Sequence, residues 1–304
     1  MTSKTDWVAV DWGTSNVRAW GIAADGGETF AVGSDRGMGK LSRDQFPAVL
    51  DALIGTQTEG DLPIIICGMA GARQGWIEAP YLDTPANLHE IVHHAVRPEG
   101  ADPRFAVRIL PGVCQRAIGS EDVMRGEETQ LLGLLGLRPD FEGTAILPGT
   151  HSKWAEIRDG RIIRFSSAMT GELYEVLSQH SVLRHSFSGE VDPAEIEYGI
   201  AEGIIAGIER PALVTSAIFR TRAAGLVSGK GAGWSSGYLS GLLVGAEIGG
   251  HRDWLDGAAV PLIGSARFGQ LYGAALKTIG IIGEPLDVTE ITIAGLMQAK
   301  AQLQ

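Results

Sequence analysis

The sequence predicts an α/β protein made of two related domains. Two segments support this, because each repeats one order: a short apolar run, a Gly-Thr loop, a strand-like run, an Asp-Gly turn and a third apolar run. The Gly-Thr loops lie in residues 7–16 and 145–154, and the Asp-Gly pairs are residues 25–26 and 159–160. Asp-Gly between two strand-like runs is a strong hairpin signal. The length of 304 residues agrees with about two domains.

The rest of the first half alternates between helices and strands. Apolar residues on one face predict the first helix, and a continuous apolar run bounded by turn residues is typical of a buried strand. This strand leads into a Gly-rich loop, residues 68–76. The elements expected here are a helix over 44–54, a buried strand over 63–67, a helix over 85–96 and a short strand over 107–110.

A strong helix candidate over residues 120–137 follows, with apolar residues spaced through it. We place the domain boundary along this helix, which gives an N-terminal domain of residues 1–120 and a C-terminal domain of residues 121–304. The elements expected after the second pair of hairpins are helices over 171–179, 195–209, 236–247, 268–279 and 289–304, and a strand over 260–263.

The charge of the chain excludes some classes of partner. The formal net charge is −11, so no basic field exists to attract nucleic acid or an anionic membrane. The longest apolar stretch, residues 237–249, contains Glu247 and is too short to cross a bilayer. Its glycines recur every fourth residue, which predicts close helix packing inside a protein core.

The chain contains only two cysteines, Cys67 and Cys114. So few cannot form a disulfide framework, and they fit a reducing cytosol, where buried cysteines act as small apolar side chains. Residues 1–6 are polar and lack the apolar centre of a signal peptide. We therefore expect a cytoplasmic protein with two buried thiols.

The two Gly-Thr loops are typical of phosphate-binding turns. Gly13 and Gly149 lack a Cβ atom, so the backbone there can turn sharply and approach an anion. Successive N–H groups in such a turn form an anion-binding concavity. The side chains that could add donors are Thr14, Ser15, Asn16, Thr150 and Ser152. One loop in each half predicts a nucleotide held between two related domains.

Asp11 ends the first strand and has the wrong charge to bind phosphate alone. A carboxylate beside a phosphate loop is explained if Mg²⁺ lies between them, with water completing its coordination shell. The sequence therefore predicts Asp11 as the residue that orients a magnesium ion.

Glu127 and Glu128 lie near the start of the helix expected over residues 120–137. Adjacent residues on a helix point in different directions, so at most one of them faces a given site. These carboxylates either offset the helix dipole or supply a general base that takes a proton from an attacking hydroxyl. On the second interpretation, the base faces the cleft between the domains.

A polar and aromatic cluster follows the buried strand over residues 63–67, at a position where functional loops are common. Arg73 could bind a carboxylate bidentately, Gln74 could bind hydroxyl groups, and Trp76 could pack against the face of a sugar. Lys153, just after the second Gly-Thr loop, is a second candidate for holding an anion.

His89, Glu90 and His93 form an H-E-x-x-H motif. On an α-helix this spacing puts both imidazoles on one face, where they could bind zinc with the glutamate as general base. The alternative is an amphipathic helix with solvated histidines, and the motif lacks a third ligand at a recognisable spacing. A zinc peptidase is therefore kept only as a remote alternative.

Taken together, these motifs resemble those of the sugar kinase, Hsp70 and actin superfamily. Residues 11–18 are similar to its first phosphate motif, residues 147–152 to its second, and residues 261–265 to its adenosine motif. Within the superfamily, the chain resembles the 2-dehydro-3-deoxygalactonokinase family. The segments that carry this resemblance are 11–20, 66–76, 122–130, 147–154 and 169–173.

The resemblance implies two actin-like (ribonuclease H-like) α/β domains with mixed sheets flanking a nucleotide cleft. It also implies transfer of a phosphoryl group from ATP to the terminal (6-) hydroxyl of 2-dehydro-3-deoxy-galactonate in galactonate catabolism, with Mg²⁺. Gly264 and Ser265 would then contact adenosine. Glu128 is nearest to the position of the catalytic base in related sugar kinases, and Glu127 is one residue away.

In the mechanism that we expect, the two loops hold the β- and γ-phosphates, and Arg18 adds positive charge if it faces inward. Arg73 and Lys153 hold the carboxylate of a small sugar acid. The alternatives within the superfamily are another sugar-acid kinase, a phosphatase or an ATPase. The sequence leaves the oligomeric state open, with a homodimer as one option.

Overall fold

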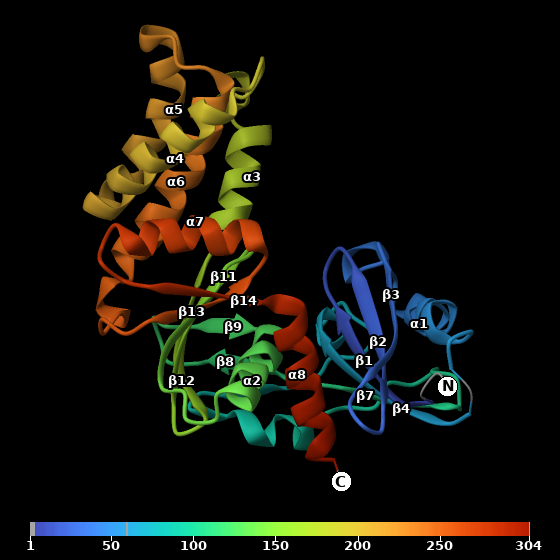
Figure 1. Cartoon of the computed structure of the whole chain (residues 1–304). Helices are drawn as coiled ribbons and strands as arrows, with labels where there is room; N and C mark the ends of the chain where they lie inside the picture. Colours follow the sequence, from blue (N-terminus) through green and yellow to red (C-terminus); the bar gives the residue numbers. More distant parts are fainter. Residues whose placement is uncertain (1–3, 59, 304) are drawn as a thin grey trace. The chain divides into compact units, whose positions relative to one another are not determined.

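The computed structural model describes residues 4–58 and 60–303 (Figure 1). The chain divides into two compact units. Unit 1 comprises Met1–Glu142, Ile157–Phe165 and Val288–Gln304, and unit 2 comprises Gly143–Glu156 and Ser166–Asp287. The two units differ from the expected domains, residues 1–120 and 121–304, because the helix after residue 120 and the last helix of the chain both belong to unit 1.

Close packing of two helices explains this division. Helix α2 (Glu127–Leu137) packs against helix α8 (Val288–Ala301). A Cβ atom added to Gly133 would lie 2.0 Å from the Ile291 carbonyl oxygen, and one added to Gly295 would lie 1.9 Å from the Thr129 carbonyl oxygen. Only glycine permits such an approach of two backbones, so this contact fastens the C-terminal helix to unit 1.

Unit 1 is built on a mixed sheet with the strand order β3-β2-β1-β4-β7. The first three strands are antiparallel, whereas β1, β4 and β7 are parallel to one another. The bounds are β1 Thr5–Trp12, β2 Val17–Ala23, β3 Glu28–Ser34, β4 Leu62–Gly68 and β7 Phe105–Ile109. The hairpin and the buried strand expected here are confirmed.

Helix α1 (Phe46–Ile54) packs on this sheet through its apolar face. The predicted helix over residues 44–54 is confirmed, except that its first residues form a short 3-10 turn, Arg43–Gln45, with a capping box between Ser42 and Gln45. Pro47 lies in the first turn of α1, where its missing N–H leaves no hydrogen bond unmade.

A second, small sheet in unit 1 has the order β5-β8-β9. Its strands are Tyr81–Asp83, Gly112–Gln115 and Asp122–Met124. The helix expected to begin at residue 120 was therefore placed too early, because residues 122–124 pair with β8. Gly126, with φ of 109°, then turns the chain into α2.

The helix expected over residues 85–96 is also wrong. Strand β6 (Ala86–Asn87) pairs with β12, and a 3-10 helix follows from Leu88 to His94. A 3-10 helix has three residues per turn, so residues four apart do not share a face. His89 and His93 therefore lack the geometry that the zinc hypothesis required.

The sheet that forms the centre of unit 2 has the order β14-β13-β10-β11-β12-β6. Strands β10 (Gly143–Leu147), β13 (Val260–Gly264) and β14 (Gly283–Asp287) are parallel. Strands β11 (Ser152–Arg158) and β12 (Arg161–Ala168) continue along the chain into unit 1. Asp159 and Gly160, which join them, both have positive φ, as the predicted tight hairpin requires.

Helices complete unit 2, and Figure 1 shows α4, α5 and α6 packed together beyond the sheet. The expected helices and the strand at residue 260 are confirmed, whereas α5 and β14 were not foreseen. The bounds are α3 Thr170–His180, α4 Pro193–Glu209, α5 Val214–Ser228, α6 Ala232–Gly250 and α7 Ala266–Lys277.

The glycine repeat of α6 packs against α4, as its four-residue spacing predicts. A Cβ atom added to Gly237, Gly241 or Gly245 would lie 2.1 to 2.5 Å from a carbonyl oxygen of α4. Among the described residues, no helix has both the length and the apolar character needed to cross a membrane. Cys67 and Cys114 are both buried and neither forms a disulfide, as expected.

Candidate active site

The first Gly-Thr loop is a tight turn between β1 and β2. The Gly13 N–H donates to the Asn16 carbonyl oxygen at 2.9 Å, and Gly37 and Gly39 donate to the carbonyl oxygens of Ser15 and Thr14. These hydrogen bonds use the backbone carbonyl oxygens of residues 14–16 as acceptors. The side chains of residues 14–16 are exposed, so the hydroxyl and amide groups predicted to bind phosphate are accessible in unit 1.

Asp11 is the last residue but one of β1 and lies directly across from Arg18 on β2. The Arg18 guanidinium donates to Asp11 Oδ2 at 2.7 Å and to Thr289 Oγ1 of α8 at 3.0 Å. On the other side, the Cys67 thiol lies 3.9 Å from Asp11 Oδ1. Arg18 therefore holds the Asp11 carboxylate in a fixed orientation, with 21% of the side chain exposed.

The surroundings of Asp11 fit magnesium but not a metal held by several protein side chains. Residues 4–58 and 60–303 contain no group of three or more His, Cys, Asp or Glu side chains placed to hold a metal ion. Magnesium usually keeps several waters and takes one or two carboxylates together with substrate phosphates. A single partly exposed carboxylate beside the loop of residues 13–16 is the donor set that such an ion uses.

Three chain segments meet beside Asp11. Strand β4 runs parallel to β1 and places Cys67 opposite Asp11. Gly68, with φ of 88°, follows Cys67 and packs so closely on Trp12 that an added Cβ atom would lie 2.7 Å from its carbonyl oxygen. A Cβ atom on Gly126 would lie 3.4 Å from the Gly68 Cα atom. The carboxyl ends of β1 and β4 therefore meet the start of α2.

Glu128 lies in the first turn of α2 and is completely buried. Its Oε2 accepts a hydrogen bond from the Gly126 N–H at 2.7 Å, and its Oε1 accepts one from the Thr129 hydroxyl at 3.0 Å. Burial raises the pKa of Glu128 to about 7, and the neighbouring Glu127 carboxylate acts in the same direction. A carboxylate with a pKa near neutrality is suited to general base catalysis.

Glu127 has a different environment, although it is the adjacent residue. It is only partly buried, and its Oε2 accepts a hydrogen bond from the Arg125 backbone N–H at 3.0 Å. This is a capping role at the start of α2. The two adjacent carboxylates therefore differ in environment: Glu127 caps the helix and is partly exposed, whereas Glu128 is completely buried.

Sequence reasoning missed Arg125, which precedes the turn into α2. Its Nη2 donates to the Ala79 carbonyl oxygen at 2.9 Å, and its guanidinium carbon lies 4.3 Å from the centre of the Tyr81 ring. Its Nε and Nη1 are covered and have no hydrogen-bond partner among the described residues. A buried guanidinium with unused donors is unusual. The sequence feature that could have drawn attention to Arg125 is its position directly before Gly-Glu-Glu.

The loop after β4 places the expected substrate residues in two different environments. Arg73 and Gln74 are exposed, and Arg43 donates to the Arg73 carbonyl oxygen at 2.8 Å. Trp76 is only 4% exposed; its ring stacks on Phe46 and its Nε1 donates to the Glu99 carbonyl oxygen at 3.0 Å. The expectation that Trp76 packs against a sugar is therefore corrected, because its faces are used in the core of unit 1.

The second Gly-Thr loop lies in unit 2, at the carboxyl end of β10. Because β10 and β13 are neighbouring parallel strands, their carboxyl ends lie at the same edge of the sheet. A Cβ atom on Gly264 would lie 3.1 Å from the Pro148 carbonyl oxygen. The structure thus brings the second phosphate loop, with Gly149 and Thr150, next to the residues expected to contact adenosine, Gly264 and Ser265. Such an edge is where α/β proteins bind ligands.

The start of α3 packs on the same loop. A Cβ atom on Gly171 would lie 2.6 Å from the Gly149 carbonyl oxygen, and the Glu172 N–H donates to the Thr150 carbonyl oxygen at 3.0 Å. The Glu172 carboxylate also pairs with His151. The loop is therefore held from behind, while Thr150 itself is exposed.

The predicted roles of Ser152 and Lys153 in binding require accessible side chains, but both side chains are buried. Ser152 is completely buried, and its hydroxyl lies 2.8 Å from the Tyr272 hydroxyl. Lys153 is 6% exposed, and its Nζ donates to Ser167 Oγ at 2.5 Å. Both residues begin strand β11, so neighbouring strands and helices cover them. The structure corrects both expectations: these side chains support the loop from inside unit 2.

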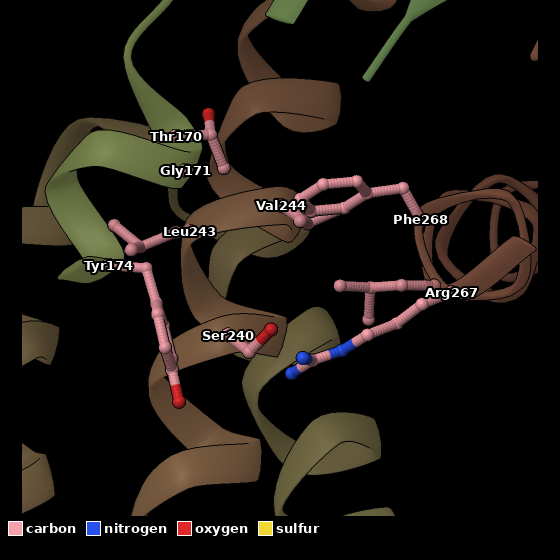
Figure 2. A pocket seen from close by; sticks show the side chains of 9 residues that line it. Thr170, Gly171, Tyr174, Ser240, Leu243, Val244, Arg267 and Phe268 are labelled. Atoms are coloured by element: carbon pink, nitrogen blue, oxygen red, sulfur yellow. The ribbon is translucent and has the colours of Figure 1, made fainter. Parts of the chain in front are cut away.

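A cavity of about 120 Å³ lies beside this loop (Figure 2). Its walls are mainly apolar, and the figure shows the Phe268 ring beside Val244 and the Arg267 guanidinium extended toward Ser240. An apolar cavity with a few polar groups is typical of a small-molecule site. The lining residues are Thr170, Gly171, Tyr174, Ser240, Leu243, Val244, Arg267, Phe268 and Leu271.

Arg267 and Phe268 lie two and three residues after Ser265, and the Ser265 hydroxyl caps α7 by accepting a hydrogen bond from the Phe268 N–H. The cap fixes the start of α7 and therefore the direction in which these two side chains leave the helix. Sequence reasoning did not single them out, although their position in the first turn of the helix after Gly264 of the strand–glycine–helix motif was the available signal.

Comparisons with known proteins agree with this assembly of motifs. Residues 11–299 match the family model of 2-keto-3-deoxy-galactonokinase. The chain is 41% identical over 303 residues to a probable 2-dehydro-3-deoxygalactonokinase of Rhizobium meliloti strain 1021, with 98% of each chain covered. It is 31% identical over 292 residues to the 2-dehydro-3-deoxygalactonokinase of Escherichia coli strain K12, with 96% of this chain and 94% of the other covered.

Solved structures confirm the fold class. A crystal structure of a candidate 2-dehydro-3-deoxygalactonokinase from Sinorhizobium meliloti is similar with a TM-score of 0.90 and 39% identity, covering 98% of this chain and 99% of that one. A ligand-bound xylulose kinase from Lactobacillus acidophilus, at 9% identity and a TM-score of 0.50 over 97% and 89% of the chains, shares the fold alone. The actin-like α/β fold is thus confirmed, and with a family match over nearly the whole chain, the chain belongs to the 2-keto-3-deoxy-galactonokinase family.

Proposed function

We propose that this protein transfers the γ-phosphoryl group of ATP to the 6-hydroxyl of 2-dehydro-3-deoxy-galactonate, a step of galactonate catabolism. Its family makes it a kinase, a phosphotransferase with an alcohol group as acceptor. The observation that carries the assignment of the site is the position of Glu128: completely buried, at the start of α2, where the carboxyl ends of β1 and β4 also meet.

Glu128 is fully covered in this structure, so in this proposal it becomes accessible when the sugar acid binds, and it then accepts the proton of the sugar-acid hydroxyl as that oxygen attacks phosphorus. The Gly126 N–H and the Thr129 hydroxyl hold the two carboxylate oxygens in place. Phosphoryl transfer depends mainly on positioning and charge stabilisation, with one group orienting or deprotonating the nucleophile. The raised pKa of Glu128, about 7, supports this role because a much more acidic carboxyl would be a weaker base.

Each Gly-Thr loop is assigned by itself to phosphate binding in its own unit, and the adenine ring is assigned to the cavity of unit 2. The exposed Thr14, Ser15 and Asn16 in unit 1, and Gly149 with Thr150 in unit 2, supply donors for phosphate oxygens. Gly264 and Ser265 lie beside the second loop, and the cavity next to them accepts a flat apolar ring system such as adenine. The lining by Phe268, Leu243 and Val244 supports this assignment.

Asp11 would hold Mg²⁺ through water, and the ion would neutralise charge on the β- and γ-phosphates. Arg18 keeps the Asp11 carboxylate oriented through its 2.7 Å contact and carries a positive charge at the same place. It also ties Asp11 to Thr289 of α8. We assign Arg18 to this positioning role rather than to direct contact with substrate.

The carboxylate of the sugar acid is assigned to Arg73, with Gln74 binding hydroxyl groups. Arg73 is exposed and its guanidinium forms no hydrogen bond or ion pair with another described residue, so its donors are available for a bidentate pair. Trp76 anchors this loop through the core, and Lys153 is left out of the substrate contacts because its ammonium donates to Ser167 inside unit 2. We place the protein in the cytoplasm, where its two thiols stay reduced, and a homodimer remains a prediction.

The test is direct measurement of ADP formed from ATP in the presence of single sugar acids. 2-Dehydro-3-deoxy-galactonate and its gluconate epimer are compared with a reaction that lacks an acceptor. We expect ADP and a phosphorylated sugar acid in equal amounts with the galactonate form. ADP and inorganic phosphate formed without any acid would instead assign the chain to the ATPases or phosphatases of the same fold.

A further inference from the structure

Glu247 is a buried carboxylate in unit 2 to which the proposed reaction gives no role. It lies on α6, and only 7% of the residue is exposed. Its Oε1 accepts a hydrogen bond from Trp154 Nε1 at 2.7 Å, and its Oε2 accepts one from the Tyr272 hydroxyl at 2.7 Å. The Thr170 hydroxyl donates to the same Oε2. Four elements therefore meet at one side chain.

Each of these donors belongs to an element that borders the candidate nucleotide site. Trp154 lies in β11, just after the second Gly-Thr loop. Thr170 is the first residue of α3 and lines the cavity. Tyr272 lies on α7, the helix that begins after Ser265, and Leu271 beside it lines the cavity too. Glu247 thus joins the elements that carry the phosphate loop and the walls of the cavity.

The hydrogen-bond directions are consistent throughout this group, which we call the Glu247 network: Ser152, Trp154, Thr170, Glu247 and Tyr272. An indole N–H can only donate, whereas a hydroxyl donates one proton and can also accept. With Glu247 ionised, the Trp154, Thr170 and Tyr272 protons all point to carboxylate oxygens, and the Ser152 hydroxyl, 2.8 Å from the Tyr272 oxygen, donates to it. Every polar hydrogen then has an acceptor.

The network reaches the phosphate loop through a rigid contact. Gly171, next to Thr170, packs so closely that an added Cβ atom would lie 2.7 Å from the Thr150 Cα atom. The Glu172 N–H donates to the Thr150 carbonyl oxygen at 3.0 Å. A displacement of Thr170 would therefore move the loop at Gly149 and Thr150 directly. At the other end of this loop, Ser152 is held by its hydrogen bond with the Tyr272 hydroxyl.

We propose that Glu247 is a positioning residue for the nucleotide, because its network sets the phosphate loop at Gly149 and Thr150 against the cavity walls on α3 and α7. This inference rests on the proposed function for the identity of the nucleotide and of its site. It adds a buried residue, outside the proposed chemistry, that determines how well the nucleotide site of unit 2 is formed. Burial favours the neutral form and raises the pKa of Glu247, whereas its three donors favour the ionised form.

The first test replaces members of the network and measures ADP and ATP binding by calorimetry, without a sugar acid. In Glu247→Gln, the amide can present its oxygen to Trp154 or to the two hydroxyls, and its NH₂ group must face the other side. The Trp154 N–H loses its acceptor in one orientation, and the Thr170 and Tyr272 hydroxyls both lose theirs in the other. Thr170→Val and Tyr272→Phe each remove one hydroxyl and keep the size of the side chain. We expect each variant to weaken nucleotide binding by about tenfold.

The matched control is Thr144→Val in the same unit. The Thr144 hydroxyl is buried and donates to the Trp254 carbonyl oxygen at 2.7 Å, at the opposite end of β10 from the phosphate loop. This variant loses one buried hydrogen bond, as Thr170→Val does, and we expect its thermal stability to fall to a similar extent. Its nucleotide affinity should stay at the wild-type value, and the KM for the sugar acid should stay unchanged in all four variants.

Nucleotide affinities of the three network variants equal to that of the wild type would overturn the inference, as would an equal loss in Thr144→Val. The outcome is separate from that of the ADP-release assay. If binding depends on the network but no sugar acid is phosphorylated, the inference stands and the proposed acceptor is wrong. If the sugar acid is phosphorylated but binding ignores the network, only the inference fails.

Discussion

Glu128→Gln tests the proposed base, because it keeps the shape of the side chain and removes its ability to take a proton. The amide oxygen can still accept the hydrogen bond from the Gly126 N–H, now made at 2.7 Å by Oε2, so the start of α2 should keep its structure. General acid–base catalysis typically contributes a factor of about 10² to 10⁴. We expect kcat to fall by about 10³ while nucleotide affinity is unchanged.

The pH dependence of the wild type follows from the pKa of Glu128, about 7. The base is active when ionised, so kcat should rise with pH and level off above the pKa. Between pH 6 and pH 8 the ionised fraction rises from about 0.09 to about 0.91, so the rate should rise about tenfold. ADP should be quantified directly in this assay, because coupling enzymes have their own pH profiles.

The same pKa makes a prediction about stability. Burial raises the pKa of Glu128 from 4.5 to about 7, so the folded state binds the proton more tightly than the unfolded chain does. The stability from this group is complete below pH 4.5 and is lost as pH rises to 7. The loss amounts to about 3 kcal/mol. Glutamine at position 128 does not titrate. The free energy of unfolding of Glu128→Gln minus that of the wild type should therefore rise by about 3 kcal/mol between pH 4.5 and pH 8.

Three results would refute this reasoning. Turnover of Glu128→Gln close to that of the wild type would remove Glu128 from the role of base. A wild-type kcat that stays constant between pH 6 and 8 would show that the titration of Glu128 does not control catalysis. A stability difference that does not grow with pH, measured by urea denaturation of both proteins, would show that the buried carboxyl does not titrate near neutrality.

Three further predictions concern the substrate, the fold and the cavity. Arg73→Ala should raise KM for the sugar acid about tenfold or more, whereas Arg36→Ala, a second exposed arginine, should leave it unchanged; steady-state kinetics with varied acid decide this. Gly295→Ala should lower the free energy of unfolding by about 2 kcal/mol or more, because its Cβ atom would lie 1.9 Å from a carbonyl oxygen of α2. Gly273→Ala, whose Cβ atom would meet nothing closer than 4.0 Å, should be neutral or stabilising by up to about 1 kcal/mol in the same urea experiment. Phe268→Ala should weaken ADP binding in calorimetry and leave KM for the sugar acid unchanged; equal affinity would remove the cavity from the nucleotide site.

Local features of the sequence were interpreted correctly where a few adjacent residues decide the conformation. The Asp159 and Gly160 turn is an example, because both residues adopt positive φ, as a two-residue hairpin requires. The glycine repeat of α6 is another, since its spacing alone places the glycines on one face. The buried strand over residues 63–67 was recognisable from its continuous apolar run.

The failures occurred where pairing with a distant segment overrides local preference. Residues 122–124 were expected to be helical, but they pair with β8, and the helix begins only after Gly126. Trp76 looked like a loop aromatic available to a sugar. Its neighbours in the core, Trp12 and Phe46, are 64 and 30 residues away in sequence, so no local pattern shows that its ring is covered.

The sequence alone was sufficient for the two Gly-Thr loops, the family and the chemistry of the candidate residues, because backbone freedom at glycine and the donor or acceptor character of a side chain are properties of the residues themselves. Which carboxylates are buried was decided by the tertiary structure. Glu127 and Glu128 are adjacent and chemically identical, and Glu247 looks like an ordinary charge in an apolar helix. Burial depends on packing between segments distant in the chain, and only that packing distinguishes Glu127, which caps a helix, from the proposed base Glu128 and from Glu247, the proposed support of the second Gly-Thr loop.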